Sequence, residues 1–318
     1  MRRHRFRFIL GLLAGIALLF AVAKFINLTR TWHEFNEYPW QTLPAILALS
    51  LGYYLVKAVR WQYFIRAIDI KLPLRRSVLV YLAGQWFAFT PAGEFVRAYL
   101  LTGYGFSFSR GSAAVAVQVV FDLLSLAIVG SLAVLRYPQL STLVQPFTAA
   151  MIVGILAFVY WPQFRRRPSS AFVPGAATAT VGRFGHFYAY SRQLLGWKQL
   201  LIGLALGLVS VVMGVLVLLE VSRNHEIEVG FTQSAYIYSL SQLAGALSML
   251  PHGLGAIEGS AVGLFHNAGV DTAHAASAIV LFRLATLGWS VVLGGVSLVL
   301  LRTPLAGPAP RSPQKPVQ

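Results

Sequence analysis

The sequence contains no cysteine and few charged side chains. The absence of Cys from its 318 residues excludes disulfide bonds, a thiol nucleophile and a cysteine-ligated metal site. Charged residues make up 11% of the chain, whereas an average soluble domain has about 25%. There is also no P-loop and no clear metal-binding motif, so we expect no cofactor and no metal. These absences exclude an ordinary soluble enzyme.

Long apolar runs take the place of the missing charges. Hydrophobic residues make up 57% of the chain, and a bilayer is crossed by about 20 consecutive apolar residues. Charge-free runs of about that length or longer cover 38–56, 137–164, 199–219 and 284–301. The sequence therefore predicts an all-α, polytopic transmembrane helix bundle.

The net charge of +16 is distributed in short clusters between these runs. The clusters lie at the N-terminus, at 66–76, at 165–167 and near the C-terminus. Clusters so placed are typical of cytoplasmic loops that contact anionic lipid headgroups, and we expect no nucleic acid partner. The prediction is a multi-pass protein of the cell (plasma or inner) membrane with both termini in the cytoplasm.

Six full spans are expected, together with two apolar stretches that Pro and Gly interrupt near the middle. If each interrupted stretch returns to its own side, 19 Lys and Arg residues lie inside and 3 outside, as the positive-inside rule requires. Two tightly connected full spans at each interruption give the same count, so re-entrant hairpins and paired spans both remain open. The expected spans are 8–26, 43–65, 111–135, 145–161, 199–221 and 272–301, and the interrupted stretches are 77–103 and 231–269.

Residues 1–302 are expected to form a single transmembrane domain. Its repeat-like halves cover about 43–161 and 199–302, and a disordered, Pro-rich cytoplasmic tail follows at 303–318. The basic cytoplasmic loop at 162–198 is expected to be a flexible linker that ends in a short amphipathic helix at 184–197 on the inner leaflet. The stretch at 8–26 is predicted to be an uncleaved first helix, although its basic start and apolar run also fit a cleavable signal peptide.

The two interrupted stretches resemble each other. The first reads Leu-Ala-Gly at 82–84 and Pro-Ala-Gly at 91–93; the second reads Leu-Ala-Gly at 243–245 and Pro-His-Gly at 251–253. Because they enter from opposite sides, they are candidates for an inverted repeat. Interrupted helices at matching places in two halves indicate the substrate site of a transporter.

The first interruption carries two charges one helical turn apart. Glu94 and Arg97 can pair on one helix face, while Pro91 and Gly93 break the backbone before them and free N–H groups. Freed N–H groups at a helix start can hold a phosphate. The alternatives are therefore a phosphate site, with Arg97 as its cation, and a capped, self-neutralising helix start.

Further ionisable residues lie within the apolar runs, where a charge needs a partner or water. Asp122 and Arg283 could pair with each other, or Arg97 could pair with Asp122; either pair would serve as a link between helices or in substrate binding. In the second interruption, Glu258 lies among the backbone-shaping residues Pro251, Gly253 and Gly255. The side chains of Lys57 and Arg60 are expected to extend to the cytoplasmic interface, or to contact headgroups there.

Taken in order, these motifs resemble those of the lysylphosphatidylglycerol synthetase membrane-region family, whose members are flippase-like integral membrane proteins. The resemblance rests on KAVRWQYFIRA at 57–67, PAGEFVRAYLL at 91–101, the helix with Asp122, LPHGLGAIEG at 250–259 and FRLATLGW at 282–289. It implies that Glu94, Arg97, Asp122, Glu258 and Arg283 occupy motif positions. Two departures are Gln118-Val119, where the family often has Glu-Arg, and His252, where glycine is common.

The resemblance implies a stand-alone lipid translocator without the aminoacyl-transfer domain of the fused members. A phosphate-bearing, anionic lipid headgroup would pass through a central cavity between the two interrupted helices, and no covalent chemistry would be needed. The alternatives are a membrane enzyme that acts on a lipid, with Glu94 or Glu258 as its base, and an accessory partner of a lipid-modifying enzyme.

Overall fold

A computed structural model of the chain describes residues 39–87, 93–134, 145–146, 148–150, 152–154, 157, 175–225 and 227–301. These residues form helices and connecting turns, and no strand occurs among them. The predicted all-α class is therefore confirmed. The predicted first span at 8–26 lies outside these residues, and so does nearly half of the span predicted at 145–161.

Four helices are long and apolar enough to cross a membrane in this part of the chain. Each matches a predicted span within a few residues. They are α3 (Leu43–Ala67), which a 3-10 turn at Trp40–Thr42 precedes, α6 (Phe108–Val134), α9 (Trp197–Asn224), and the continuous α12 (Thr272–Arg283), η7 (Leu284–Gly288) and α13 (Trp289–Leu301).

Both interrupted stretches break where Pro and Gly predicted. The first consists of α4 (Leu74–Gln85), the 3-10 turn η2 (Gly93–Phe95) and α5 (Val96–Thr102); the second consists of α10 (Phe231–Leu247), the 3-10 turn η6 (Pro251–Gly253) and α11 (Ala256–Asn267). Residues 88–92, with Pro91, are outside the described part.

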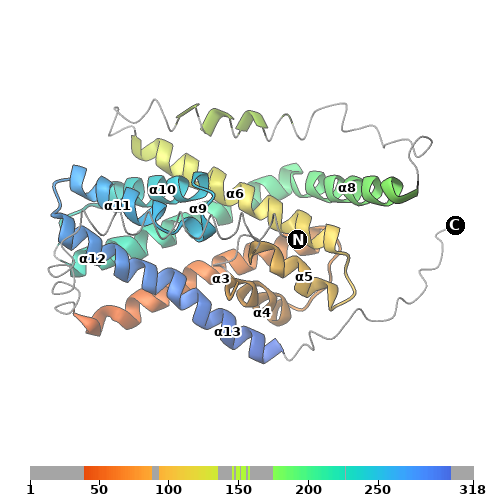
Figure 1. Cartoon of the computed structure of the whole chain (residues 1–318), viewed down its shortest axis with the longest axis horizontal. Coiled ribbons are helices and arrows are strands. Elements are labelled where there is room, and N and C mark those ends of the chain that lie inside the picture. Colours follow the sequence, from red (N-terminus) through yellow and green to blue (C-terminus); the bar gives the residue numbers. More distant parts are fainter. Residues whose placement is uncertain are drawn as a thin grey trace.

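The direction of the long helices shows that the two interrupted stretches enter the bundle from opposite ends. In Figure 1, α3 runs from left to right and α6 returns from right to left. The hairpin of α4 and α5 between them therefore begins and ends at the right-hand end of the bundle. Likewise α9 runs to the left and α12–α13 runs back to the right, so α10 and α11 belong to the left-hand end.

Local chemistry explains several helix ends. Pro44 lies in the first turn of α3, where its missing N–H costs no helical hydrogen bond. Asp271 caps α12, since its carboxylate accepts a hydrogen bond of 3.0 Å from the Ala273 N–H. The predicted basic loop at 162–198 contains a further helix, α8 (Gly175–Leu194), and its Gln193 side chain donates a hydrogen bond of 2.6 Å to the Ala67 carbonyl at the end of α3.

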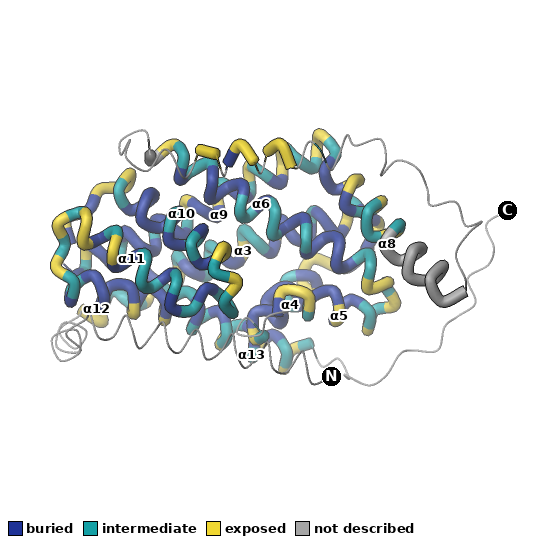
Figure 2. Tube along the Cα trace, turned by 45° about the horizontal axis from the view of Figure 1, so that its top comes forward, coloured by how far each residue is buried: buried dark blue, intermediate teal, exposed yellow. Residues whose placement is uncertain are grey.

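Small residues along α9 allow its neighbours to approach closely. A Cβ at Gly203 would lie 2.7 Å from the Phe64 ring, and a Cβ at Gly214 would overlap the Tyr238 ring. Close backbone approach through small residues is the usual way in which membrane helices associate. Figure 2 shows the result, because the facing sides of α3, α6, α9 and α10 are buried.

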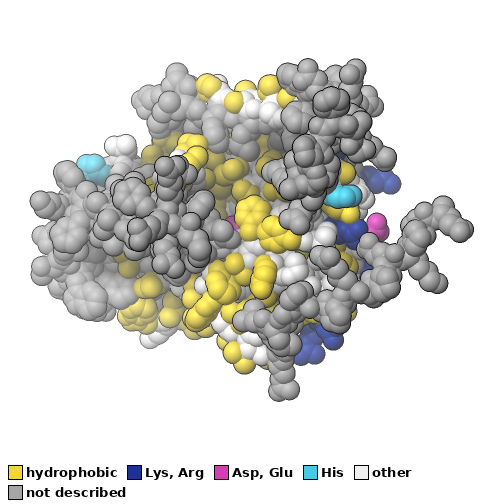
Figure 3. Space-filling view, turned by 45° about the vertical axis from the view of Figure 1, so that its right-hand side comes forward, with side chains coloured by type: hydrophobic (Ala, Val, Ile, Leu, Met, Phe, Trp, Pro, Cys, Tyr) yellow, Lys and Arg dark blue, Asp and Glu magenta, His cyan; other side chains and the backbone are white. Residues whose placement is uncertain are grey.

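Basic side chains gather at the right-hand end of the bundle. Arg66 ends α3, Arg75 and Arg76 begin α4, Arg110 begins α6, and Lys198 begins α9. Figure 3 turns this end toward the viewer and shows Lys and Arg side chains at its margin, with hydrophobic side chains across the middle. The described residues at this end are therefore rich in basic side chains.

Candidate functional site

Arg97 is buried within the first half of the chain. Its side chain is 2% exposed and forms the predicted ion pair with Glu94 one turn earlier. The guanidinium carbon lies 4.7 Å from the centre of the Tyr81 ring, and Nη1 donates a hydrogen bond of 3.4 Å to Gln118. A side chain at Gly84 would overlap the Arg97 stem, so the glycine of the first Leu-Ala-Gly motif makes room for this cation.

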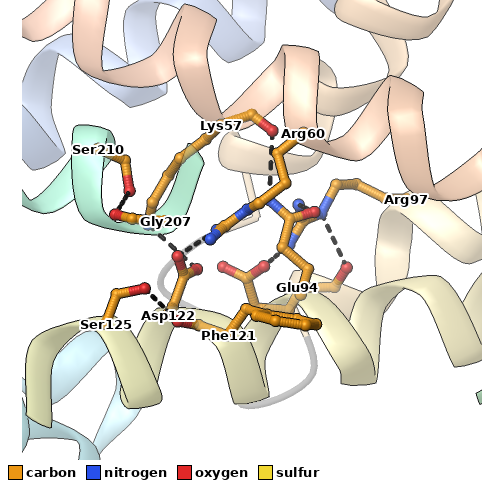
Figure 4. Close-up of polar contacts among 10 residues, drawn as sticks. Lys57, Arg60, Glu94, Arg97, Phe121, Asp122, Ser125, Gly207 and Ser210 are labelled. Carbon is orange, nitrogen blue, oxygen red and sulfur yellow. Dashed lines mark hydrogen bonds and ion pairs between the residues drawn. The ribbon is translucent and has the colours of Figure 1, made fainter. Parts of the chain in front are cut away.

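Asp122 lies between two cations from α3. Its carboxylate pairs with the Lys57 ammonium at 3.2 Å and with the Arg60 guanidinium, and Figure 4 shows all three side chains converging between α3 and α6. Neither pairing proposed from the sequence for Asp122 occurs, because α3 supplies both cations. Arg97 and Arg283 instead pair with Glu94 and Glu258.

This arrangement corrects the interfacial prediction for Lys57 and Arg60. The Arg60 side chain is 0% exposed, and that of Lys57 is 16% exposed, so neither extends to a lipid interface. The reason is the carboxylate of Asp122, which provides a partner inside the bundle and removes the need to reach water. A side chain at Gly207 on α9 would meet Arg60, so this glycine leaves space for the guanidinium.

Glu258 and Arg283 form an ion pair in the second half. Arg283 Nε lies 2.6 Å from Glu258 Oε1, and its Nη2 donates a hydrogen bond of 3.2 Å to the His252 carbonyl. The other carboxylate oxygen of Glu258 accepts a hydrogen bond of 2.7 Å from the Gly255 N–H. Two residues predicted separately for the site therefore act together, and they fix the interruption before α11 to α12.

The predicted backbone-shaping residues of the second interruption lie in and beside the turn η6. Pro251 begins η6, and Gly253 and Gly255 adopt φ values of +65° and +82°, which favour glycine. Gly93 is buried at the start of η2, and Pro91 lies outside the described residues.

A central cavity of about 250 Å³ lies where the two halves meet. The first half contributes Tyr53 and Lys57 from α3 and Asp122 from α6. The second half contributes Ser210 from α9, Tyr238 and Gln242 from α10, and His252 from η6. Of the five predicted headgroup residues, only Asp122 lines this cavity.

Sequence reasoning missed Tyr53, Tyr238 and Gln242 as cavity residues. The sequence did contain a signal for these cavity residues, because each is a polar side chain in the interior of an apolar helix. Tyrosine, however, also occurs at membrane interfaces, so its type alone does not distinguish the two locations. His252 was noted only as a residue of the loop, and the structure places it beside the cavity.

The described residues hold no group of three His, Asp or Glu side chains arranged as metal ligands. The cavity wall offers ionic and hydrogen-bonding groups: an ammonium, a carboxylate, two phenols, an amide and an imidazole. Such groups can bind and orient a polar ligand.

Comparison with known proteins gives a consistent picture. The model of a family described as "Lysylphosphatidylglycerol synthase TM region" matches residues 8–295. Two relatives from Methanothermobacter thermautotrophicus, each named "UPF0104 membrane protein", are 24% identical to the chain. One aligns over 273 residues, 76% of this chain and 79% of the relative; the other aligns over 305 residues, 89% of this chain and 90% of the relative.

Proposed function

Because the chain belongs to the lysylphosphatidylglycerol synthase TM-region family and is an integral membrane protein, we propose that it translocates a lipid. The phosphate-bearing headgroup would pass through the central cavity, and the acyl chains would stay in the membrane. This function needs a polar path across the apolar layer, since a bare headgroup cannot cross hydrocarbon cheaply.

The observation that carries the proposal is the composition of the central cavity. Its wall combines Lys57 and Asp122 with residues of the second interruption, among them His252 and Gly253. In transporters, interrupted helices provide the substrate site near the middle of the membrane. A cavity lined by both an interrupted helix and a buried ion pair resembles such a substrate site.

The packing of the helices supports an inverted repeat. In sequence order, α3, α4, α5 and α6 correspond to α9, α10, α11 and α12–α13. The contacts between halves are reciprocal, because α6 packs on α10, α13 packs on α4, and α3 packs on α9. Corresponding long helices also run in opposite directions in Figure 1. Rocking of one half against the other would then expose the cavity to each side in turn.

We propose that the end with Arg66, Arg75 and Arg76 faces the cytoplasm of the cell membrane, in accordance with the positive-inside rule. The last helix, α13, which ends at Leu301, runs toward this same end in Figure 1. With the span predicted at 8–26, both termini would then be cytoplasmic, and the hairpin of α10 and α11 would enter from the opposite face.

A membrane enzyme and an accessory subunit of a lipid-modifying pathway are the alternatives. An enzyme would need a carboxylate free to accept a proton from its substrate. In the structure Asp122 and Glu258 are each bound by an arginine, and Glu94 pairs with Arg97. The proposal therefore includes no covalent step.

Blocking the cavity tests the proposal. Ala246 lines the cavity, whereas its neighbour Leu247 is 62% exposed and lies outside the cavity wall. In liposomes with fluorescent phospholipids, dithionite quenching reports lipid movement from the inner leaflet. We expect Ala246→Trp to reduce the rate at least tenfold and Leu247→Trp to leave it within twofold of the wild type.

Size-exclusion chromatography of both variants provides the folding control. Equal rates for Ala246→Trp and the wild type would contradict passage through the cavity. If the wild type moves no lipid of a panel with different headgroups, lipid translocation itself is wrong, and the enzyme and accessory alternatives take its place.

A further inference from the structure

The charges between the two ends of the bundle do not balance. In the described part of the chain, the segments between the two ends of the bundle hold four cationic side chains and three carboxylates, and the side chain of one of these, Glu94, is 48% exposed. Three arginines each have a carboxylate partner: Arg60 pairs with Asp122, Arg97 with Glu94, and Arg283 with Glu258. Lys57 is the additional cation, and it shares Asp122 with Arg60.

An excess buried cation raises the free energy of the bundle unless an anion accompanies it. Asp122 supplies one negative charge to two positive ones, so the cluster of Lys57, Arg60 and Asp122 has a formal charge of +1. Arg60 is the more deeply placed cation, with a side chain 0% exposed and a close contact to Gly207 on α9. Lys57 is the cation on the wall of the cavity.

The surroundings of Lys57 leave its ammonium directed at the cavity. The Nζ atom lies 3.2 Å from Asp122 Oδ2 and 4.7 Å from the centre of the Tyr53 ring. An ammonium has three N–H donors, and the carboxylate and the aromatic face do not use all of them. The phenol of Tyr238 and the amide of Gln242 lie on the same wall and add neutral donors.

The size of the cavity limits what can accompany Lys57. Pockets for drug-sized ligands hold about 300–1,000 Å³, and this cavity holds about 250 Å³. That space suits a phosphate ester of a small alcohol. A headgroup that also carries an ammonium would bring another positive charge close to Lys57. Asp122 could not neutralise it, because Asp122 already pairs with both Lys57 and Arg60.

We propose that the central cavity binds the phosphate of a lipid with a small, net anionic headgroup, and that Lys57 is the cation that binds it. This assignment rests on the proposed function and narrows it, since it excludes lipids whose headgroup carries a compensating ammonium. When the lipid binds, its phosphate pairs with the Lys57 ammonium, and Asp122 remains paired with Arg60. Each charge in the cavity then has one counter-charge.

Binding of short-chain lipids to the purified full-length chain tests the assignment. Native mass spectrometry in detergent would compare phosphatidylglycerol with phosphatidylcholine and lysyl-phosphatidylglycerol of equal chain length. We expect phosphatidylglycerol to bind at least tenfold more tightly than the other two, because it alone is net anionic. Comparable affinities for all three would overturn the assignment.

Variants of Lys57 locate the binding charge. Loss of a charge-assisted hydrogen bond weakens binding roughly tenfold to a hundredfold, so we expect that reduction for Lys57→Gln and less than a threefold change for Lys57→Arg. The matched control is Lys198→Gln, which removes an exposed lysine at the basic end of α9 and should leave the affinity unchanged. Wild-type affinity in a folded Lys57→Gln variant would overturn the assignment.

Two further experiments distinguish a lipid phosphate from free phosphate as the ligand, and separate the lipid selectivity from translocation itself. Inorganic phosphate should not displace phosphatidylglycerol at equal concentration; if it does, the ligand is free phosphate and the lipid assignment is wrong. In the liposome assay, equal movement of all three lipids would contradict the selectivity alone. Absence of any lipid movement would contradict translocation, while the binding measurements would still decide the role of Lys57.

Discussion

At the scale of the residue, Glu258 links three parts of the second half. Its carboxylate accepts hydrogen bonds from the Gly255 N–H and from Arg283, and Arg283 also donates to the His252 carbonyl. The side chains of Glu258 and Arg283 are 14% and 10% exposed. A partly buried pair of this kind penalises the loss of one partner more than the loss of both, because a lone charge remains.

We therefore expect Arg283→Gln to reduce the free energy of unfolding by about 3 kcal/mol. Unfolding in mixed micelles, followed by tryptophan fluorescence, provides the measurement. The double variant Glu258→Gln with Arg283→Gln should lose less than the sum of the two single variants, since the two residues interact directly. Additive losses would show that the ion pair does not carry the effect.

The sequence identified local ion pairs better than distant ones. Glu94 and Arg97 are three residues apart, so helical geometry alone brings their side chains together. Asp122 is 62 residues from Arg60, and its partner depends on which helices pack together. Lys57 and Arg60 did offer a hint, because two cations one turn apart on an apolar helix need a carboxylate on a facing helix.

At the scale of the element, the second interruption depends on a contact between two glycines. A Cβ on Gly253 would lie 2.8 Å from the Gly245 Cα, and Gly253 has a φ of +65°. The Leu-Ala-Gly and Pro-His-Gly motifs therefore meet at their glycines, which brings the end of α10 close to η6. This contact holds His252 beside the cavity.

Replacing Gly253 by alanine should therefore be costly. We expect Gly253→Ala to lower the free energy of unfolding by about 2 kcal/mol, from the left-handed backbone and the close contact together. Gly263 in α11 is the matched control, because it is exposed and a Cβ there would meet nothing within 4 Å. Gly263→Ala should be neutral or gain up to about 1 kcal/mol, as expected in a helix interior.

The same micelle unfolding assay compares these two variants. A loss in Gly263→Ala equal to that in Gly253→Ala would show that alanine is poorly tolerated throughout this hairpin, and that the glycine contact has no special role.

Hydrophobic runs predicted all four long helices of the part that the structure describes, and Pro and Gly predicted both breaks. The structure adds two elements that these signals did not indicate. One is the first part of α8, because only a short amphipathic helix at 184–197 was expected within the basic loop. The other is the π-helical turn η7, because residues 284–288 contain no proline and only one glycine, at the last position. Packing between helices, which a single sequence does not reveal, determines such a turn.

At the scale of the whole molecule, the absence of cysteine makes the orientation directly measurable. Lys71 is exposed at the basic end, and Glu228 is exposed at the opposite end, between α9 and α10. We expect a membrane-impermeant maleimide to label the Glu228→Cys variant in intact cells and the Lys71→Cys variant only after permeabilisation. The reverse pattern would contradict the proposed orientation, and labelling of both in intact cells would contradict opposite sides.

The π-helical turn η7 divides the last long helix into two parts with different neighbours. Before the turn, α12 packs on α11; after it, α13 packs on α4, where a Cβ at Gly295 would lie 2.7 Å from the Trp86 ring. The Tyr54 hydroxyl donates a hydrogen bond of 3.2 Å to the Thr286 carbonyl within the turn. A π-helical turn contains one residue more than an α-helical turn, and each residue accounts for about 100° of rotation.

Deleting one residue here would therefore rotate α13 about its own axis by about 100° and shorten the helix by only about 1.5 Å. The small-residue face of α13 would leave Trp86, while Arg283 would keep its place beside Glu258. The one additional residue of η7 thus determines which face of α13 packs on α4 of the other half. The length of this segment is therefore under a stricter constraint than the identity of its side chains.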